Sequence, residues 1–328
     1  MINRKTRLLA IVTITVLCLT LISGCQQSSA PGLEEVTVLL DWTPNTNYSG
    51  LYAAKDMGYY REEGLEVEIV QAPGSVPQLL SAGKGKFGVS YQEEVTFARL
   101  ENIPIVSIAA VVQHNSSGFA SLIETGINTP ADFEGKKYGG WGSPVEEATI
   151  KALAERFGAD FNKVEIITAG EADFFTIIER LADFAWIYYG WNGVEAELKG
   201  LELNFIKLRD LDPALDYYTP VLITSETVIN ERPDLAKKFM RATARGYRLA
   251  IDNPEKAAEI LLNNAPELDR ELVMASQQWL AGKLQDDAEK WGWQEKNTWE
   301  SYTKWLYDNR LIQEMPELDR AFTNEFIP

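Results

Sequence analysis

VTVLLDWTPNTNYSGLYAAKDMG, residues 36–58, begins with an apolar run, continues through a loop rich in Pro, Asn and Thr, and ends with a second apolar segment before Gly58. We interpret 36–42 as a strand and 51–57 as a helix, because a short apolar run bounded by turn residues is typical of a buried strand. Strand followed by helix recurs along the chain. This order predicts an α/β fold with parallel sheets covered by helices on both faces, and ligands at the carboxyl ends of strands.

The alternation falls into two units, followed by a region that is almost wholly helical. In the first unit we expect further strands at 65–69, 87–91 and 103–112, and helices at 76–82 and 93–100. In the second we expect strands at 136–141, 164–168, 184–189 and 204–208, and helices at 145–157 and 174–181. Apolar spacing of three and four predicts C-terminal helices at 234–251, 254–263, 271–284 and 298–309.

Two such units predict two doubly wound lobes joined by a two-segment hinge. We place the crossings in 103–122 and 219–228, so that lobe 1 comprises 35–114 plus 225–328 and lobe 2 comprises 115–224. The C-terminal aromatic residues fall at helical spacing, which favours a role in the core over a sugar platform.

The N-terminal residues are typical of a bacterial export signal. Arg4, Lys5 and Arg7 precede an apolar core at 8–21, and Leu21-Ile22-Ser23-Gly24-Cys25 resembles the lipobox, in which the cysteine is acylated and the chain is cut before it. We therefore predict a lipoprotein signal peptide at 1–24, lipid attachment at Cys25 and a linker at 25–34. The mature chain would lie outside the cytoplasm, anchored to the cell membrane.

Charge and composition exclude several classes of function. Loss of the three signal cations would take the formal charge from −17 to −20, which repels nucleic acid. His114 is the one histidine and Cys25 the one cysteine of the mature chain, so we expect no metal site, no cofactor and no disulfide. No nucleophile motif accompanies His114, and we expect no catalytic residue.

Candidate ligand residues follow the expected strands. Trp42, Asn45 and Tyr48 lie in the loop after the first strand, where an indole, a carboxamide and a phenol can stack on a flat ring and bind its polar edge. Asn and Pro are also ordinary turn residues. Tyr91 and Glu93 follow a later strand of the same unit, although Glu93 also suits the first turn of a helix.

The second unit offers a matching set. Glycines around Trp141, including Gly142, let backbone approach a ligand, while Ser143 and Glu146 form a capping box whose helix start can donate N–H groups. Alternation sends Tyr188 and Tyr189 to opposite faces of their strand. The remaining candidates are Trp191, just past the strand end, and Glu195.

The combined crevice is rich in aromatic, carboxamide and carboxylate groups and poor in Arg and Lys. Nitrate, sulfate, phosphate or sulfonate would require cations or many helix N-termini. This chemistry suits a neutral or cationic flat heterocycle that carries amino groups.

Five stretches carry a resemblance to a known family: LDWTPNTN (40–47), GVSYQE (88–93), VQHNSSG (112–118), YGGWGSP (138–144) and DFAWIYYGW (183–191). They resemble the thiamine-pyrimidine binding proteins of ABC importers, and among these the ThiY type, which binds N-formyl-4-amino-5-aminomethyl-2-methylpyrimidine, a precursor in thiamine salvage. The similarity runs from about residue 36 to residues 322–326. It implies the type II periplasmic-binding fold, and permease and ATPase partners.

The same superfamily includes the yeast-type pyrimidine synthases of thiamine biosynthesis, which share the two-lobed fold. Their cysteine-rich iron motif is absent from this sequence, and Tyr48 stands where relatives commonly have histidine. We therefore expect a solute-binding protein that closes like a hinge on its ligand. The alternatives are a binding protein for another small solute, such as a sulfonate, nitrate or riboflavin, and a pyrimidine synthase-like enzyme.

For the pyrimidine, the expected roles are as follows. Trp42, Trp141 or Trp191 stacks on the ring. Asn45, Tyr91 and Ser143 bond to its polar edge, and Glu93 or Glu195 accepts from its amine.

Overall fold

The computed structural model describes residues 32–170 and 172–328. The predicted signal peptide, Cys25 and residues 26–31 of the predicted linker lie outside the described residues. Within the described ranges, none of the helices has the length and apolar character needed to cross a membrane.

The first sheet has five strands in the order β2-β1-β3-β10-β4. β1 (Glu34–Leu40) runs parallel to β2 (Leu65–Gln71) and β3 (Phe87–Ser90). β10 (Val221–Ser225) is antiparallel to β3 and to β4 (Ile105–Ala110). The sheet is therefore mixed.

The second sheet also has five strands, in the order β7-β6-β8-β5-β9. β6 (Lys137–Gly140) is parallel to β7 (Glu165–Thr168) and β8 (Phe184–Tyr188). β5 (Ser117–Leu122) is antiparallel to β8 and to β9 (Leu203–Lys207). The expectation of all-parallel sheets was wrong for one strand in each sheet. β5 and β10 each arrive from the other sheet, so no βαβ crossover within one sheet fixes them parallel to a neighbour.

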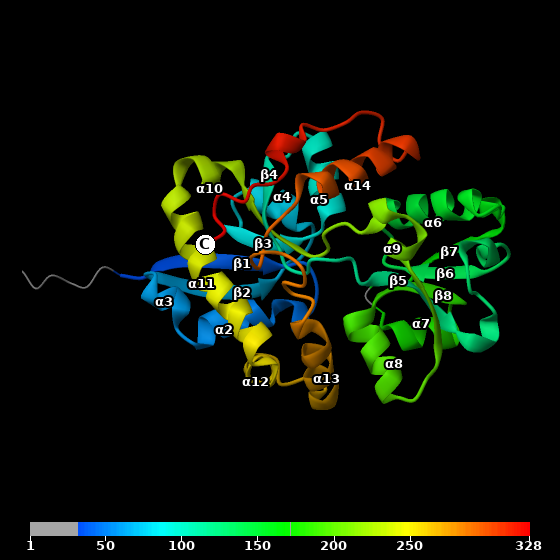
Figure 1. Cartoon of the computed structure of the whole chain (residues 1–328), viewed down its shortest axis with the longest axis horizontal. Coiled ribbons are helices and arrows are strands. Elements are labelled where there is room, and N and C mark those ends of the chain that lie inside the picture. The colour runs from blue at the N-terminus through cyan, green and yellow to red at the C-terminus, as the bar shows by residue number, and fades with distance from the viewer. Residues whose placement is uncertain (1–31, 171) are drawn as a thin grey trace, which may run out of the picture. The chain divides into compact units, whose positions relative to one another are not determined.

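The chain crosses between the sheets twice. It leaves the first sheet after β4 and enters the second at β5, and it returns between the end of β9 and the start of β10 (Figure 1). β10 pairs in the first sheet from Val221 onward, so the return crossing ends before the boundary that we placed after residue 224. The division into two lobes stays a prediction.

Helices connect the strands and form the C-terminal region (Figure 1). With the first sheet belong η2 (Thr46–Tyr48), α2 (Ser49–Asp56), α3 (Tyr59–Glu62), α4 (Val76–Ser81) and α5 (Gln92–Leu100). With the second belong η3 (Ile123–Thr125), η4 (Pro130–Phe133), α6 (Pro144–Arg156), η5 (Phe161–Lys163), α7 (Phe174–Arg180), η6 (Tyr189–Gly193), α8 (Val194–Leu198), α9 (Leu208–Leu211) and η7 (Pro213–Leu215). After β10 come α10 (Glu226–Glu231), α11 (Pro233–Asp252), α12 (Pro254–Asn264), α13 (Arg270–Ala281), α14 (Lys296–Asp308) and η8 (Leu318–Arg320).

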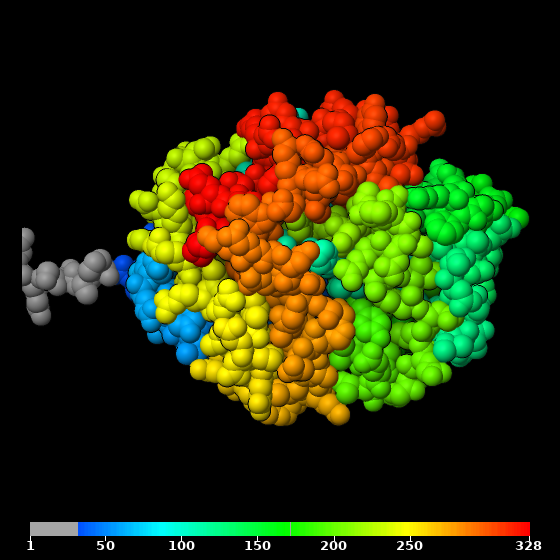
Figure 2. Space-filling model, viewed as in Figure 1, coloured from blue at the N-terminus to red at the C-terminus, as the bar shows by residue number. Residues whose placement is uncertain are grey.

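The C-terminal helices complete the core rather than forming a separate layer. α11 packs so closely on α2 that a Cβ added at Gly50 would lie only 2.3 Å from the Tyr247 ring. Trp291, Trp299, Tyr302 and Trp305 are buried, which confirms the expected core role for these four, whereas Tyr307 is exposed. In the space-filling view the orange part of the C-terminal region, which includes α13, lies directly against the green segments of the second sheet (Figure 2).

Candidate functional site

A buried carboxyl group marks the end of β1. Asp41 accepts a hydrogen bond of 2.9 Å from the Tyr48 hydroxyl, and the Tyr91 hydroxyl, just past the end of β3, lies close enough to lower the pKa of the same carboxyl. Burial nevertheless raises the pKa of Asp41, since the low-dielectric surroundings disfavour the charged form more than these phenols favour it. The loops after two neighbouring strands thus meet around one carboxyl.

Tyr91 and Tyr188 bring the two sheets together at this point. Tyr91 follows β3 of the first sheet and Tyr188 ends β8 of the second, and their rings stack with centroids 6.4 Å apart and planes 18° apart. The Tyr188 hydroxyl lies 3.0 Å from Oγ1 of Thr219, in the return crossing. Burial and then Glu93 raise the pKa of Tyr188 well above its ordinary value.

Glu93, in the first turn of α5, completes this group. Its side chain is buried, Tyr217 donates to Oε1 over 3.4 Å, and Oε2 has no hydrogen-bond partner among the described residues. Burial raises the pKa of Glu93 to about 8. A buried carboxyl with an unused oxygen is costly unless something pairs with it, which makes Glu93 a ligand-binding candidate.

Glu94 adds a third carboxyl. It accepts a hydrogen bond of 2.5 Å from Ser90, and burial is the main cause of its raised pKa. In the described part of the chain, no Lys, Arg or His is among the main groups that shift the pKa values of Asp41, Glu93 or Glu94. We call Asp41, Tyr48, Tyr91, Glu93, Glu94, Tyr188, Tyr217 and Thr219 the acid–phenol cluster.

The acid–phenol cluster has a definite chemical preference. Its carboxyls accept hydrogen bonds or, when protonated, also donate one, and its phenols do both. Its rings offer faces for stacking. It lacks the cations that an anionic ligand requires, so it suits a flat ligand with amino groups.

Trp42 and Trp191 flank the strand ends. Trp42 follows β1 and Trp191 lies in η6 after β8, yet both are partly buried against the core cluster that includes Val38 and Leu40. The Trp191 indole, from the turn after a strand of the second sheet, thus packs against the core of the first sheet. Both indoles stay candidates for stacking.

The loop before α6 has less free hydrogen-bonding capacity than we expected. Ser143 is the N-cap of α6, and the predicted capping box with Glu146 is confirmed. Glu146 also accepts from the backbone N–H groups of Trp141 (3.2 Å), Gly142 (2.8 Å) and Ser143 (2.7 Å), and from the Tyr138 hydroxyl (2.5 Å). The donors that we assigned to a ligand are therefore taken by this buried carboxyl.

Trp141 is the exposed member of that loop. Its side chain is 38% exposed and packs edge to face on Trp186, with ring centroids 5.8 Å apart. It keeps a free surface for a ligand.

Three predicted residues have other partners. The Asn45 carboxamide caps η2, accepting from Asn47 N (3.0 Å) and donating to Thr43 O (3.0 Å). Glu195 pairs with Lys199 at 3.2 Å along α8. Tyr189 faces away from Tyr188, as alternation predicted, and its hydroxyl donates to Glu197 over 2.5 Å. The structure does not bring Glu195 or Tyr189 into the acid–phenol cluster, and Asn45 lies beside its member Tyr48 with its polar groups already used.

Several residues were missed from sequence. Asp41, Tyr217 and Thr219 were not selected, although Asp41 lay in the quoted loop and Tyr217 lies just before the predicted crossing segment 219–228. Ser276 of α13 was also missed: its buried hydroxyl lies 2.6 Å from Thr46 Oγ1 and donates to the Gly190 carbonyl. It links the loop after β1 to the turn after β8, and no local sequence signal marks it.

His114 has a structural role in the crossing segments. Nδ1 lies 2.7 Å from Asp216 and Nε2 lies 3.2 Å from Asp287, which raises the pKa of His114 to about 9, chiefly through the bond to Asp216. His114 follows β4 and Asp216 precedes β10, so the pair ties the two crossings together. Across residues 32–170 and 172–328, no group of three His, Cys, Asp or Glu side chains could hold a metal ion.

Comparison with known proteins places the chain in a family. The model of the family described as NMT1/THI5 like matches residues 45–257. The chain belongs to this family. The expected resemblance, to thiamine-pyrimidine binding proteins related to the yeast-type synthases, is thereby confirmed.

NMT1/THI5-like relatives include both binding proteins and enzymes. A protein of Halalkalibacterium halodurans named formylaminopyrimidine-binding protein is 30% identical over 94% of this chain and 96% of its own length. A 4-amino-5-hydroxymethyl-2-methylpyrimidine phosphate synthase of Legionella pneumophila is 26% identical over 89% of this chain and 92% of its own.

Solved structures confirm the fold of this NMT1/THI5-like chain. The alkanesulfonate-binding protein SsuA of Xanthomonas axonopodis pv. citri superposes with a TM-score of 0.68 at 13% identity, covering 90% of this chain and 99% of that one. The two mixed sheets with their helices therefore form the periplasmic-binding-protein fold, as expected. Together the comparisons support a solute-binding protein, in a family that also contains synthases.

Proposed function

We propose that this chain is the extracytoplasmic substrate-binding lipoprotein of an ABC importer, and that it captures N-formyl-4-amino-5-aminomethyl-2-methylpyrimidine for thiamine salvage. Hinge closure would bury the ligand and present the closed protein to the permease. The name of the Halalkalibacterium halodurans relative supports this ligand.

The observation that carries the proposal is the free Oε2 of Glu93 in a cluster of carboxyls and phenols. A neutral carboxyl can donate to a ring nitrogen of a 4-aminopyrimidine and accept from its exocyclic amine, making two bonds with one group. Because burial holds the pKa of Glu93 at about 8, the group carries a proton at neutral pH. Glu93 is therefore the residue that we assign to the amine.

Stacking of aromatic side chains on the pyrimidine ring is the second part of the proposed ligand recognition. The ring pair Tyr91 and Tyr188 and the indoles of Trp42, Trp141 and Trp191 stay candidates for the ring faces. Asn45, Ser143 and Glu195 are withdrawn from the ligand-contact proposal, because local partners use their polar groups. Tyr189 is withdrawn because it faces away from the cluster.

Glu146 disfavours the binding of anionic solutes at the start of α6. The N–H groups of residues 141–143 at the start of α6 would otherwise favour an oxyanion, and Glu146 already takes them. A sulfonate or nitrate would compete with an internal carboxyl and meet the carboxyls of Asp41 and Glu94. Riboflavin, a larger neutral ring system, stays an alternative ligand.

Titration calorimetry of the soluble mature chain tests the ligand. We expect binding of the formylated pyrimidine and no heat from nitrate or an alkanesulfonate. Glu93→Leu, which removes both the donor and the acceptor, should weaken pyrimidine binding roughly ten- to hundredfold, as for loss of a hydrogen bond to a buried ionisable group. Tight binding of a sulfonate or riboflavin with none of the pyrimidine would overturn the proposal.

The Legionella pneumophila relative makes a synthase the second candidate. Incubation of the protein with the formylated pyrimidine, followed by mass spectrometry, separates the two. Recovery of intact ligand supports a binding protein, whereas conversion would show an enzyme. His114 is held by Asp216 and Asp287, which favours binding over catalysis.

A further inference from the structure

A second cavity lies away from the acid–phenol cluster, on the opposite face of β8. It has a volume of about 420 Å³ and is lined by the first crossing, by β9, by α9 and by the end of α13. Tyr189 lines it, whereas Tyr188 lies with Tyr91 on the other face. The cavity is therefore separate from the proposed pyrimidine site.

Four basic side chains face this second cavity in a chain whose formal charge is −17: His114, which is paired with Asp216 and Asp287, and Lys207, Arg209 and Lys283. Lys207 and Arg209 come from the second sheet and its following helix, and Lys283 comes from the segment after α13. Within the described residues, Arg209 and Lys283 form no ion pair, and the contact of Lys207 with Asp210 is long, at 3.8 Å. The carboxylate that lines the cavity is Asp286.

The cations act on one another. Burial lowers the pKa of Lys283, and the neighbouring Arg209 and Lys207 lower it further, against the opposing effect of Asp286. Like charges that outnumber the carboxylates beside them repel one another, and an anion between them would relieve that repulsion.

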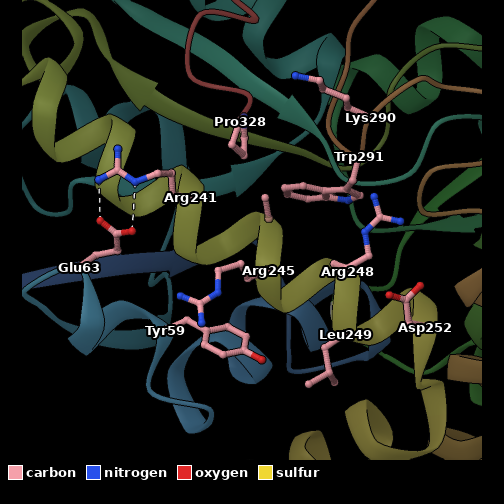
Figure 3. Close-up of a pocket in the computed structure, with 11 residues that line it drawn as sticks. Tyr59, Glu63, Arg241, Arg245, Arg248, Leu249, Asp252, Lys290, Trp291 and Pro328 are labelled. Atoms are coloured by element: carbon pink, nitrogen blue, oxygen red, sulfur yellow. Dashed lines mark hydrogen bonds and ion pairs between the residues drawn. The ribbon is translucent and has the colours of Figure 1, made fainter.

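A larger cavity provides the contrast. It measures about 640 Å³ and lies along α11, where Arg241 and Arg245 point toward it (Figure 3). Glu63 holds Arg241 through bonds of 3.0 and 2.6 Å, and Glu62 holds Arg245 at 2.6 Å. Arg241 and Arg245 thus have carboxylate partners, unlike Arg209 and Lys283. Arg248 and Lys290, which also line the larger cavity, form no ion pair within the described residues.

The walls of the second cavity are aromatic. Tyr189 packs against Phe205 and Trp279 with ring centroids 5.0 and 5.8 Å apart, and all three residues line the cavity. Lys283 Nζ lies 4.0 Å from the Trp279 ring centroid. A volume of about 420 Å³, apolar walls and a few charged groups are typical of a pocket for a small organic molecule.

We propose that this cavity binds a small aromatic anion, such as an aryl phosphate or an aromatic carboxylate. Its charged group would lie between Lys207, Arg209 and Lys283, and its ring against Tyr189, Phe205 and Trp279. The ligand would bridge the second sheet and the C-terminal helical region. It would differ in charge from the amine-bearing solute of the acid–phenol cluster.

Titration calorimetry with phenyl phosphate, benzoate and neutral benzyl alcohol, on the soluble mature chain, tests the proposal. We expect the two anions to bind and benzyl alcohol not to bind. Arg209→Gln and Lys283→Gln should each weaken phenyl phosphate binding roughly tenfold or more, as expected for one charged hydrogen bond. Inorganic phosphate, which lacks the ring, should bind more weakly than phenyl phosphate.

The controls separate charge at the cavity from net charge and from misfolding. Lys84→Gln removes one exposed cation elsewhere and should leave phenyl phosphate binding unchanged. Lys283→Arg keeps the charge and should retain binding, which guards against a Gln variant that fails to fold. Glu93→Gln should also leave phenyl phosphate binding intact.

Three results would each overturn the proposal. The first is that the wild-type protein binds neither phenyl phosphate nor benzoate. The second is that it binds benzyl alcohol as tightly as the two anions. The third is that both Gln variants fold and bind phenyl phosphate with unchanged affinity. A protein that fails to bind pyrimidine but still binds phenyl phosphate would refute the proposed function and leave the second site standing.

Discussion

The Tyr217 hydroxyl lies 3.4 Å from Oε1 of Glu93, and it is the one hydrogen-bond partner of that side chain in the described part of the protein. Tyr217 comes from the return crossing and Glu93 from the start of α5, residues 124 positions apart. The bond therefore joins a crossing segment to the carboxyl that we assign to the ligand. The other oxygen of the Glu93 carboxyl, Oε2, has no hydrogen-bond partner among the described residues, and we assign it to the ligand.

Glu93→Gln should change how stability depends on pH. Burial raises the pKa of Glu93 from 4.5 to about 8, so between these values the folded chain keeps a proton that the unfolded chain releases. Wild-type stability therefore falls as pH rises through this window. The variant should match the wild type near pH 4 and exceed it by about 2–4 kcal/mol above pH 8.

Urea denaturation of both proteins at pH 4, 6, 8 and 9 measures this difference. Glu101→Gln, an exposed change just after α5, is the matched control and should leave the profile unchanged. A difference between wild type and Glu93→Gln that does not vary with pH would contradict the assignment.

Alanine at the three tryptophans should weaken pyrimidine binding where the indole stacks on the ring. A stacked nucleobase is worth about 1–3 kcal/mol, or roughly a 5- to 150-fold change in Kd. Trp141 is the cleanest position, because at 38% exposure its removal should cost little stability. Calorimetry on Trp42→Ala, Trp141→Ala and Trp191→Ala decides among them, and unchanged affinity in all three would exclude indole stacking.

Ser276→Ala should lower stability by about 1–3 kcal/mol, because it leaves Thr46 and the Gly190 carbonyl without a buried partner. Gln278→Ala, on the exposed face of the same helix, is the control and should change stability little. Denaturant titration measures both. Equal stability of Ser276→Ala and wild type would mean that this link contributes nothing.

His114→Gln should lose a stabilisation that depends on pH. Asp216, and then Asp287, raise the pKa of His114 from 6.5 to about 9, so the contribution is full below pH 6.5 and disappears as pH rises through about 9. The variant should be less stable than the wild type at pH 6 and nearly equal to it at pH 10. A stability gap that persists at pH 10 would argue for a loss of packing.

Cys25→Ala tests the proposed anchor. One acyl chain binds membranes only marginally, whereas two give stable anchoring, and the linker then keeps the protein near its permease. The variant should move to the soluble fraction and impair uptake, while the purified protein binds pyrimidine as before. Uptake and membrane retention equal to wild type would remove the anchor from the proposal.

Much of the fold could be predicted from local patterns. The α/β alternation, the long C-terminal helices and the capping box of Ser143 and Glu146 depend on residues near in sequence. The direction of β5 and β10 could not be predicted from local patterns, because each strand pairs with strands that are distant in the chain. For the same reason the sequence did not show that β10 joins the first sheet from Val221 onward.

The residues of the candidate site were likewise predicted only in part from the sequence. Trp42, Tyr48, Tyr91, Glu93 and Tyr188 were selected because they follow strands, and the structure places four of them, Tyr48, Tyr91, Glu93 and Tyr188, in the acid–phenol cluster. Asn45, Ser143 and Glu195 were equally plausible by residue type. Their local hydrogen bonds and ion pair remove them from the proposal, and of these only the capping role of Ser143 was visible in the sequence.

The sequence by itself determined the fold class and the family, since both follow from local order and residue type. Only the tertiary structure decided that Tyr217 faces Glu93, that Glu146 takes the donors of α6, and that Tyr189 joins Lys207 and Lys283 at a second cavity. These relationships depend on which distant segments meet in space, and on burial, which raises the pKa of Glu93. No local pattern encodes either.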